Sequence, residues 1–286
     1  MRRTIAVLSV LALASPLGCA STNDLASQKQ AIEGGQCPAD WYDVTPPNPD
    51  WNLPPTLGDL LPLRFYDTES IAVFFPADFA ALQTMLPPGV SPLEVAPGLG
   101  VVTIGFSIYG DSDYLGKFRE ATISVLVSDS SLYEGYTPLY FLDILATSEA
   151  AQWKNAAAFN FNNLALGDDN GNAHCQEYSP KRIRCIASAY DQLIFKIDVD
   201  TSDMVPVPIP PVLMMSEKDG MLLRTPWIAS GKAFGSDTVG GTTIQLGDHP
   251  VAQLLKAIGV GTLPSINQAV APSEDATLYP STCAPL

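Results

Sequence analysis

Glu120 is the residue whose setting best suits acid–base chemistry. It lies in a strand-like segment, where side chains alternate between two faces, so Glu120 shares a face with Phe118 and Thr122 while Arg119 lies on the other. A carboxylate inside an apolar lumen has a raised pKa and can act as a general acid or base. The alternative is a carboxylate at the rim that pairs with Arg119 or Lys117, and the sequence leaves both open.

Two further side chains offer related chemistry. Lys154 lies in the helix-like stretch 151–160, where a solvated and protonated lysine is the ordinary finding. A lysine attacks a carbonyl group only when a depressed pKa populates the neutral amine. His249 precedes Pro250 at a helix start, so we expect capping or packing first and acid–base chemistry second. His249 and His174 are the two histidines of the chain, so no metal site built on several imidazoles is expected.

The cysteines are typical of an exported protein. Setting Cys19 aside leaves four, an even number that suits an oxidising compartment, and four cysteines allow three pairings. Cys175 and Cys185 flank a turn that contains a proline, so an antiparallel hairpin would place them opposite each other. A second bond, Cys37–Cys283, then follows by elimination.

Residues 1–19 resemble a secretory leader. They contain two arginines, then an apolar stretch, then small residues. The apolar stretch is shorter than the roughly 20 residues that a membrane-spanning helix needs. Leu17-Gly18-Cys19 resembles a lipoprotein signal that would lipidate Cys19, but ordinary signal cleavage also suits these residues, and both remain open. We expect export, to the periplasm, outer membrane or cell surface as a lipoprotein, or otherwise secretion.

Composition limits the partners. The formal net charge of −15 repels phosphate backbones, so nucleic acid is not expected to bind, and membrane contact is expected only through a lipid on Cys19. A small molecule is the expected partner. After the leader the chain divides into a flexible tether (20–36), a proline-rich arm (37–65), one domain (66–265) and a C-terminal tail (266–286).

The domain is predicted to be mainly β, or α+β. Strand-like segments occupy 70–75, 101–108, 121–127 and 193–199. Three short helices are expected, one starting at Pro76, one over 149–156 capped by Ser148 or Thr147, and one opening at Pro250. Many antiparallel strands with few helices favour a closed or nearly closed sheet, which removes exposed edges.

Four segments in order resemble the acetoacetate decarboxylase-like family. They are Phe79 to Pro88, Gly116 to Glu120 (GKFRE), Gly135 to Asp143 (GYTPLYFLD) and Ile244 to Pro250 (IQLGDHP). The resemblance spans residues 66–265. It implies an antiparallel β cone or barrel with a central, funnel-like pocket and a few short helices.

The resemblance also implies a chemistry, and the sequence departs from it. The family attacks a keto acid with a lysine that forms a Schiff base. Counting from Asp143 places Phe159 where that lysine stands, so the nucleophile is missing at the expected position. The family's earlier acidic residue falls on Gly105 and its arginine near Thr68. Of the catalytic set, only Glu120 matches.

Two lysines could replace the missing nucleophile. Lys154 lies five residues before Phe159, and a shift of register would restore it. Lys196 lies on the polar face of its strand, where an exposed lysine is the more common finding.

Two hypotheses follow, and whether the protein is an enzyme is left open. The first is an exported protein that binds a small carbonyl or keto-acid-like ligand in its cone without lysine-dependent decarboxylation. The second is a carboxy-lyase, or a related lyase that processes carbonyl compounds, using Glu120 and a non-standard lysine such as Lys154. No cofactor is expected. The predicted ligand-binding residues are Phe159, Tyr140, Arg119 and His249.

Overall fold

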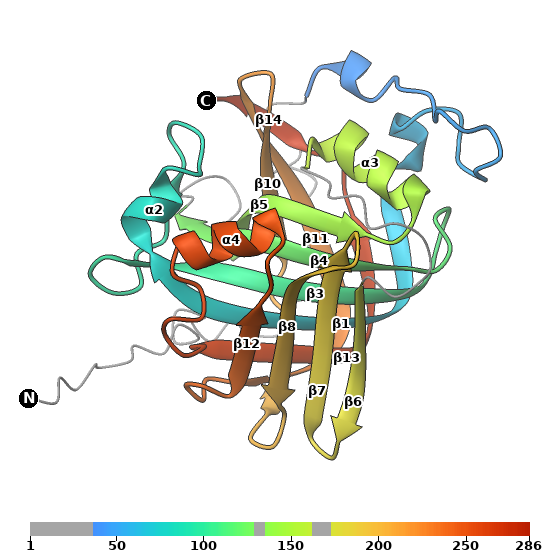
Figure 1. The fold of residues 1–286 in the computed structure, drawn as a ribbon. Coiled ribbons are helices and arrows are strands. Elements are labelled where there is room, and N and C mark those ends of the chain that lie inside the picture. The colour runs from blue at the N-terminus through green and yellow to red at the C-terminus, as the bar shows by residue number, and fades with distance from the viewer. Residues whose placement is uncertain (1–36, 129–134, 162–172) are drawn as a thin grey trace, which may run out of the picture.

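The computed structural model describes residues 37–128, 135–161 and 173–286, which form two β-sheets and three short α-helices (Figure 1). The large sheet has the order β10-β5-β4-β3-β1-β13-β11-β14, with β2 beside β4 and β9 beside β11. The small sheet has the order β12-β8-β7-β6. The mainly β, α+β class expected from the alternating segments is confirmed.

The strands of the large sheet are long and strongly curved (Figure 1). They are β1 (Leu63–Asp78), β2 (Ser91–Pro92), β3 (Leu99–Ser112), β4 (Phe118–Ser128), β5 (Thr137–Ala146), β9 (Val205–Val207), β10 (Val212–Lys218), β11 (Met221–Ser236), β13 (Asn267–Leu278) and β14 (Thr282–Pro285). Those of the small sheet are β6 (Ala173–Ser179), β7 (Arg182–Ala189), β8 (Gln192–Asp200) and β12 (Thr242–Leu246).

The strand pairs of the large sheet are antiparallel, as the resemblance implies, apart from one parallel pair, β10 with β5. Strand β10 pairs with β11 in antiparallel and with β5 in parallel. The parallel ladder joins only four residue pairs, from Val212 with Thr137 to Met215 with Tyr140, so the closure of the sheet is partial.

One correction concerns the C-terminal segment. Residues 266–286 were expected to form a tail outside the domain, but β13 lies between β1 and β11 within the large sheet, and β14 pairs with β11. A sheet strand can pair with partners far away in sequence, so its own short pattern does not reveal its place. The segment is therefore part of the domain.

The helices largely follow their capping signals. Helix α3 (Glu149–Phe159) has the predicted Ser148 as its N-cap, and α4 (Pro250–Ala257) has His249. Helix α2 (Phe79–Gln83) begins three residues after the predicted Pro76, because β1 runs on to Asp78, whose carboxylate caps the helix. Among the described residues no helix is long and apolar enough to span a membrane.

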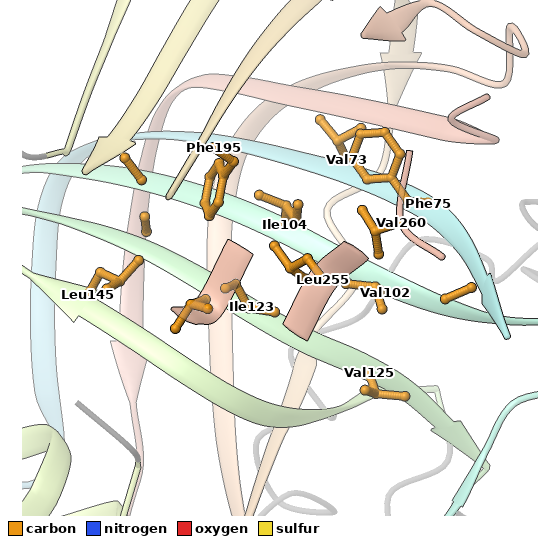
Figure 2. Packing of buried hydrophobic residues seen from close by; sticks show 14 of the residues in the cluster. Val73, Phe75, Val102, Ile104, Ile123, Val125, Leu145, Phe195, Leu255 and Val260 are labelled. Atoms are coloured by element: carbon orange, nitrogen blue, oxygen red, sulfur yellow. The ribbon is translucent and has the colours of Figure 1, made fainter. Parts of the chain in front are cut away.

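The two faces of the large sheet bury different clusters. One face packs on the small sheet and α4, where Phe195 and Leu255 meet Ile104 and Ile123 (Figure 2). The opposite face packs on α3 and on the arm, with Leu57 among its fully buried residues. Burial of apolar area on both faces holds the layers together. The face that packs on α3 also borders a cavity.

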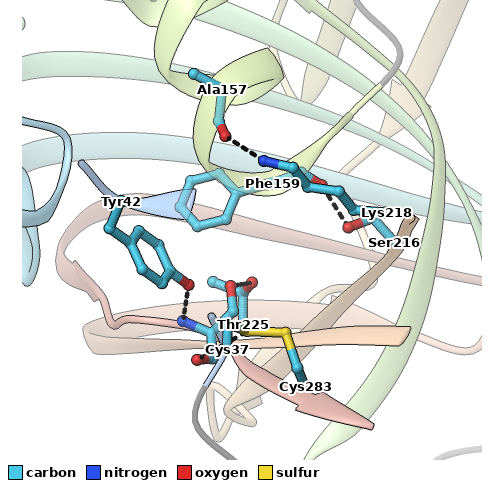
Figure 3. The surroundings of a disulfide bond; sticks show 9 residues. Cys37, Tyr42, Ala157, Phe159, Ser216, Lys218, Thr225 and Cys283 are labelled. Atoms are coloured by element: carbon cyan, nitrogen blue, oxygen red, sulfur yellow. Dashed lines mark hydrogen bonds between the residues drawn. A yellow bond between two sulfur atoms is a disulfide. The ribbon is translucent and has the colours of Figure 1, made fainter. Parts of the chain in front are cut away.

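The arm before β1 is held by a disulfide bond. Cys37 is bonded to Cys283 of β14, and the Tyr42 hydroxyl accepts a hydrogen bond from the Ser281 amide at 3.1 Å (Figure 3). Farther along the arm, the indole of Trp51 lies 6.2 Å from that of Trp153 in α3, centroid to centroid. The arm therefore tethers the C-terminal strand and contacts the helix that carries Lys154.

Candidate active site

A cavity of about 250 Å³ lies on the inner face of the large sheet, between β1, β3, β4, β13 and helix α3. Most of its wall is apolar, with aromatic side chains from Phe65, Phe141 and Trp227. Within this wall stand the ionisable side chains of Glu120, Lys154, Tyr109 and Glu274. A small concave site with a few convergent polar groups is the usual form of a ligand pocket.

Glu120 lies in this cavity and is 6 % exposed. Its Oε2 accepts a hydrogen bond from the Tyr109 hydroxyl at 3.0 Å, and its Oε1 accepts one from Asn155 Nδ2 at 2.9 Å. These partners come from β3 and α3, so they fix the carboxylate from two sides. Arg119 and Lys117, the expected rim partners, are both exposed.

Lys154 points into the same cavity and is 2 % exposed, contrary to the solvated lysine expected at this helical position. Its Nζ lies 4.0 Å from Glu120 Oε1. The rings of Phe65, Phe118 and Phe159 surround the amine, with centroids 5.5, 5.9 and 6.0 Å from Nζ. Burial among these rings lowers the pKa of Lys154, and the Glu120 carboxylate partly offsets this by raising it.

Helix α3 carries both Lys154 and Asn155 to Glu120, and its ends are fixed. Ser148 Oγ accepts a hydrogen bond from the Ala151 amide at its start. At its end, Lys218 Nζ donates to the Ala157 carbonyl at 3.2 Å, and Ser216 Oγ donates to the Phe159 carbonyl (Figure 3). A helix held at both ends positions its side chains more exactly than a loop does.

A second acidic group, Glu274 of β13, lies elsewhere on the cavity wall and is 3 % exposed. Its Oε1 accepts a hydrogen bond from Ser70 Oγ at 2.7 Å, and Ser70 Oγ lies 3.3 Å from Ser107 Oγ. Burial raises the pKa of Glu274, and the Ser70 hydrogen bond partly offsets this. Gly231 of β11 faces Glu274 at φ +152°, where an added Cβ would lie 2.9 Å from the Glu274 Cα.

The polar groups form a row across four neighbouring strands. Glu120 of β4 pairs with Ser107 of β3, and Ser107 pairs with Ser70 of β1, which binds Glu274 of β13. The β1–β13 pairing is irregular on both sides of Thr68. Such irregularity changes which face a strand presents, so Phe65 and Ser70, five residues apart, both line the cavity.

Burial also affects Tyr109, which donates a hydrogen bond to Glu120. The pKa of Tyr109 is raised well above its usual value, first by burial and then by the negative charge of Glu120. Its hydroxyl therefore stays protonated and can donate to the carboxylate. Tyr109 acts as a fixed hydrogen-bond donor at this site.

The four predicted ligand-binding residues lie outside the cavity wall. Phe159, the last residue of α3, is fully buried in the core. Its ring contacts that of Phe161, which does line the cavity. Tyr140 packs on the opposite face of the sheet, and Arg119 is exposed. These assignments are corrected because period two turns both side chains away from the cavity.

His249 has the structural role that was expected of it first. Its Nδ1 accepts a hydrogen bond from the Val251 amide at 3.3 Å as the N-cap of α4, on the far side of the large sheet. Burial lowers its pKa. His249 is therefore a capping residue of α4.

Several site residues were missed by reasoning from the sequence. The sequence around Asn155 and Tyr109 contains no pattern that indicates a functional site. Glu274 lies in the segment that was predicted to be a tail. Gly105, at the position where the family has an acidic residue, lines the cavity, and a Cβ there would meet Thr122 Oγ1 at 2.5 Å. A side chain at position 105 would therefore require Thr122 to move.

The other predicted sites are the two disulfide bonds and the lipidation site. Both expected disulfide bonds, Cys37–Cys283 and Cys175–Cys185, are present. The leader, the tether and Cys19 lie outside the described residues. Within the described part of the chain, no group of three or more His, Cys, Asp or Glu side chains is placed to hold a metal ion.

A larger groove of about 400 Å³ lies between β1 and the hairpin β6–β7. Its charged residues are Glu69, Glu177, Lys181 and Arg182, all of them exposed. Solvated charges keep ordinary reactivity, and nothing there matches the desolvated Lys154 amine. The smaller inner cavity is therefore the better candidate for chemistry.

Comparisons with known proteins agree with the fold. The model of the acetoacetate decarboxylase family matches residues 45–156, a segment that contains Glu120, Lys154 and Asn155. No curated protein matches the chain significantly. The resemblance expected from the four segments is confirmed.

Solved structures extend the likeness to most of the chain. An acetoacetate decarboxylase from Legionella pneumophila has 18 % identity and a TM-score of 0.56, covering 85 % of this chain and 93 % of its own. The enduracididine biosynthesis enzyme MppR complexed with pyruvate has 13 % identity and a TM-score of 0.58, covering 78 % and 90 %. Another MppR structure, with a condensation product of pyruvate and imidazole 4-carboxaldehyde, has 13 % identity and a TM-score of 0.59, covering 83 % and 98 %.

Proposed function

We propose that this chain, which has the fold of acetoacetate decarboxylase and matches that family over residues 45–156, captures a small carbonyl compound as an imine on Lys154. One observation carries the proposal. The Lys154 amine is desolvated inside a cavity and lies 4.0 Å from the buried carboxylate of Glu120.

The lowered pKa of Lys154 is what makes the amine a nucleophile. The neutral amine attacks the carbonyl carbon, and the carbonyl oxygen takes up a proton, giving a carbinolamine. Loss of the hydroxyl group with a proton, as water, leaves a protonated imine on Nζ. The positively charged carbon–nitrogen bond then withdraws electrons from the neighbouring bonds of the ligand.

Glu120 is placed to move the protons in these steps. Its Oε1, 4.0 Å from Nζ, can accept the ammonium proton and return it to the departing hydroxyl group. Tyr109 and Asn155 hold the carboxylate in place by their hydrogen bonds. The carboxylate also pairs with the cationic imine once it has formed.

The relatives support a carbonyl ligand. MppR is described in complex with pyruvate, a keto acid, and with a condensation product of pyruvate. The mostly apolar cavity of about 250 Å³ suits a compound of that size or somewhat larger. This arrangement favours the lyase hypothesis over the hypothesis of a binding protein without an amine.

We further propose that the protein acts outside the cytoplasm. Two disulfide bonds, one of them closing a loop of 246 residues, suit an oxidising compartment, in agreement with the leader-like segment 1–19. Lipidation at Cys19 stays an alternative to ordinary cleavage. Mass spectrometry of the exported protein would distinguish the two forms.

Borohydride trapping tests the imine directly. The folded, disulfide-bonded protein is incubated with pyruvate, acetone or 5-hydroxypentan-2-one and reduced, and peptide mass mapping then locates the adduct. We expect a stoichiometric adduct on Lys154 with at least one of the three compounds, and its loss in Lys154→Met. Lys196→Met, which changes a half-buried lysine of β8, is the matched control and should leave the adduct unchanged.

Two results would overturn the proposal. One is the absence of an adduct with all three compounds while circular dichroism shows a folded protein. The other is an adduct that persists in Lys154→Met at its original yield.

A further inference from the structure

We infer that the carbonyl compound bound in this cavity is uncharged and carries a hydroxyl group that reaches Glu274. The inference rests on the proposed imine at Lys154, and it names the class of substrate for the same site. It follows from the charges and hydrogen-bonding groups on the cavity wall.

The cavity has no spare positive charge. Among the described residues that line it, Lys154 is the one cationic side chain, and Glu120 and Glu274 are acidic. The internal segments outside the description, 129–134 and 162–172, contain no lysine or arginine in their sequence. Once Lys154 forms an imine, its positive charge is matched by Glu120, and no cation remains for a ligand carboxylate.

An anionic ligand would therefore be desolvated with no cation to pair with. Burial of an ion without a partner of opposite charge is unfavourable. Glu274 would add repulsion, since it lies on the same wall at 3 % exposure. The cavity thus disfavours keto acids, although MppR is described with pyruvate bound.

Glu274 offers a suitable site for a ligand hydroxyl group instead. A carboxylate has about four acceptor positions, and the Ser70 hydrogen bond occupies one of them. The row Glu120, Ser107, Ser70, Glu274 runs from the amine to this acceptor across neighbouring strands. A ligand with its carbonyl group at Lys154 would direct its hydroxyl group along this row toward Glu274.

Thr103 points to the same kind of ligand. Its hydroxyl group is buried on the cavity wall and has no hydrogen-bond partner among the described residues. A buried hydroxyl group without a partner is costly, so a polar ligand atom would be stabilising there. A purely apolar ketone would leave this group and Glu274 unmatched.

The substrate class limits the reaction. Without a carboxylate next to the imine, the site cannot release carbon dioxide, so the electrons withdrawn by the imine come from other bonds of the ligand. A substrate of this class would therefore undergo a reaction other than decarboxylation, although the chain has the fold of acetoacetate decarboxylase.

A matched pair of carbonyl compounds tests the inference. We compare 5-hydroxypentan-2-one with 4-oxopentanoate by the rate of adduct formation on Lys154 with cyanoborohydride. Each rate is divided by the rate of the same compound with N-acetyl-lysine amide, which corrects for the intrinsic reactivity of the carbonyl group. We expect the hydroxy ketone to react at least about tenfold faster, the effect of one hydrogen bond to a charged group.

The variant Glu274→Gln gives a second test. It keeps the shape of the side chain but removes its charge, so the ratio of the hydroxy-ketone rate to the oxo-acid rate should fall and the oxo-acid rate should rise. Glu69→Gln, which changes an exposed carboxylate of β1, should leave both rates unchanged. The comparison in the unmodified protein stands even if Glu274→Gln does not fold.

The outcomes separate this inference from the proposed function. Equal or faster reaction of the oxo acid at Lys154 would overturn the inference and leave the imine in place. Failure of every compound to react at Lys154 would overturn the proposed function itself.

Discussion

The large and the small sheet each hold charged pairs, but the pairs differ in depth and in distance. In the cavity of the large sheet, Lys154 and Glu120 are 4.0 Å apart, with side chains 3 % and 8 % exposed. On the small sheet, Arg182 and Asp200 are 2.8 Å apart, with side chains 45 % and 29 % exposed. The closer pair is the more solvated one.

The physical consequences are opposite. The exposed pair is screened by water and contributes little to stability or reactivity. The buried pair loses hydration, so the pKa of Lys154 is lowered. In a second pair of the small sheet, Arg184 with Asp198, the hydrogen bond to the carboxylate of Asp198 raises the pKa of Arg184. Burial therefore has the larger effect on the pKa of Lys154, and the close carboxylate has the larger effect on that of Arg184.

Removal of the disulfide bonds is expected to have the largest effect on the free energy of unfolding, and the two bonds should differ. Replacing Cys37 and Cys283 by serine should lower the free energy of unfolding by about 4–5 kcal/mol, because the bond closes a loop of 246 residues. Replacing Cys175 and Cys185, which close a loop of 10 residues, should cost about 2–3 kcal/mol. Denaturant unfolding under non-reducing conditions measures both.

Trapping at Lys154 gives a second readout of the same variants. Loss of the Cys37–Cys283 bond should also slow imine formation, since the arm packs Trp51 on Trp153 of helix α3, which carries Lys154. Loss of Cys175–Cys185 should not. An equal slowing in both variants would contradict the assignment of the arm to the site.

Removing one carboxylate from each sheet tests reactivity. Glu120→Gln should lower the limiting rate of imine formation about 100-fold, the usual contribution of a general acid–base group. Since Glu120 raises the pKa of Lys154, its removal should also move the midpoint of the pH–rate profile further below 10.5. The rate rises as pH increases through this midpoint because only the neutral amine attacks.

The control for this variant lies on the small sheet. Asp198→Asn breaks the 2.6 Å pair with Arg184 and should change neither the limiting rate nor the midpoint. A midpoint that moves upward in Glu120→Gln would contradict the pairing of Glu120 with the amine.

Replacing whole pairs gives the smallest effect. The double variant Lys154→Met with Glu120→Gln should raise the free energy of unfolding at pH 7 by about 1–2 kcal/mol, because it removes two desolvated charges. The double variant Arg184→Met with Asp198→Asn, which removes a solvated pair, should leave the free energy of unfolding nearly unchanged. Thermal or urea unfolding compares them, and a marked loss of stability in the first variant would indicate a structural role for the buried pair.

Much of the fold could be predicted from local pattern. Alternation placed Glu120 and Thr122 on the cavity face and Arg119 outside, and capping signals located α3 and α4. The hairpin turn between Cys175 and Cys185 indicated one disulfide bond. These features depend on residues that are neighbours in sequence.

The burial of Lys154 could not be predicted in the same way. Helix α3 is rich in alanine on all sides, so its sequence does not indicate which face packs on the sheet. Counting from Asp143 pointed to Phe159 for the amine, but the helix turns Phe159 into the core and Lys154 into the cavity. The direction of a helical side chain depends on what the helix packs against.

The sequence by itself determined the strand-rich class, the side of β4 on which Glu120 lies and the pairing of the cysteines. Only the tertiary structure decided that Lys154 meets Glu120 and that Glu274 joins the same cavity. Strand β13 reaches its place between β1 and β11 by pairings across about 200 residues, such as Thr68 with Glu274. Period and capping are set within a few residues, whereas desolvation depends on every element that closes over a side chain.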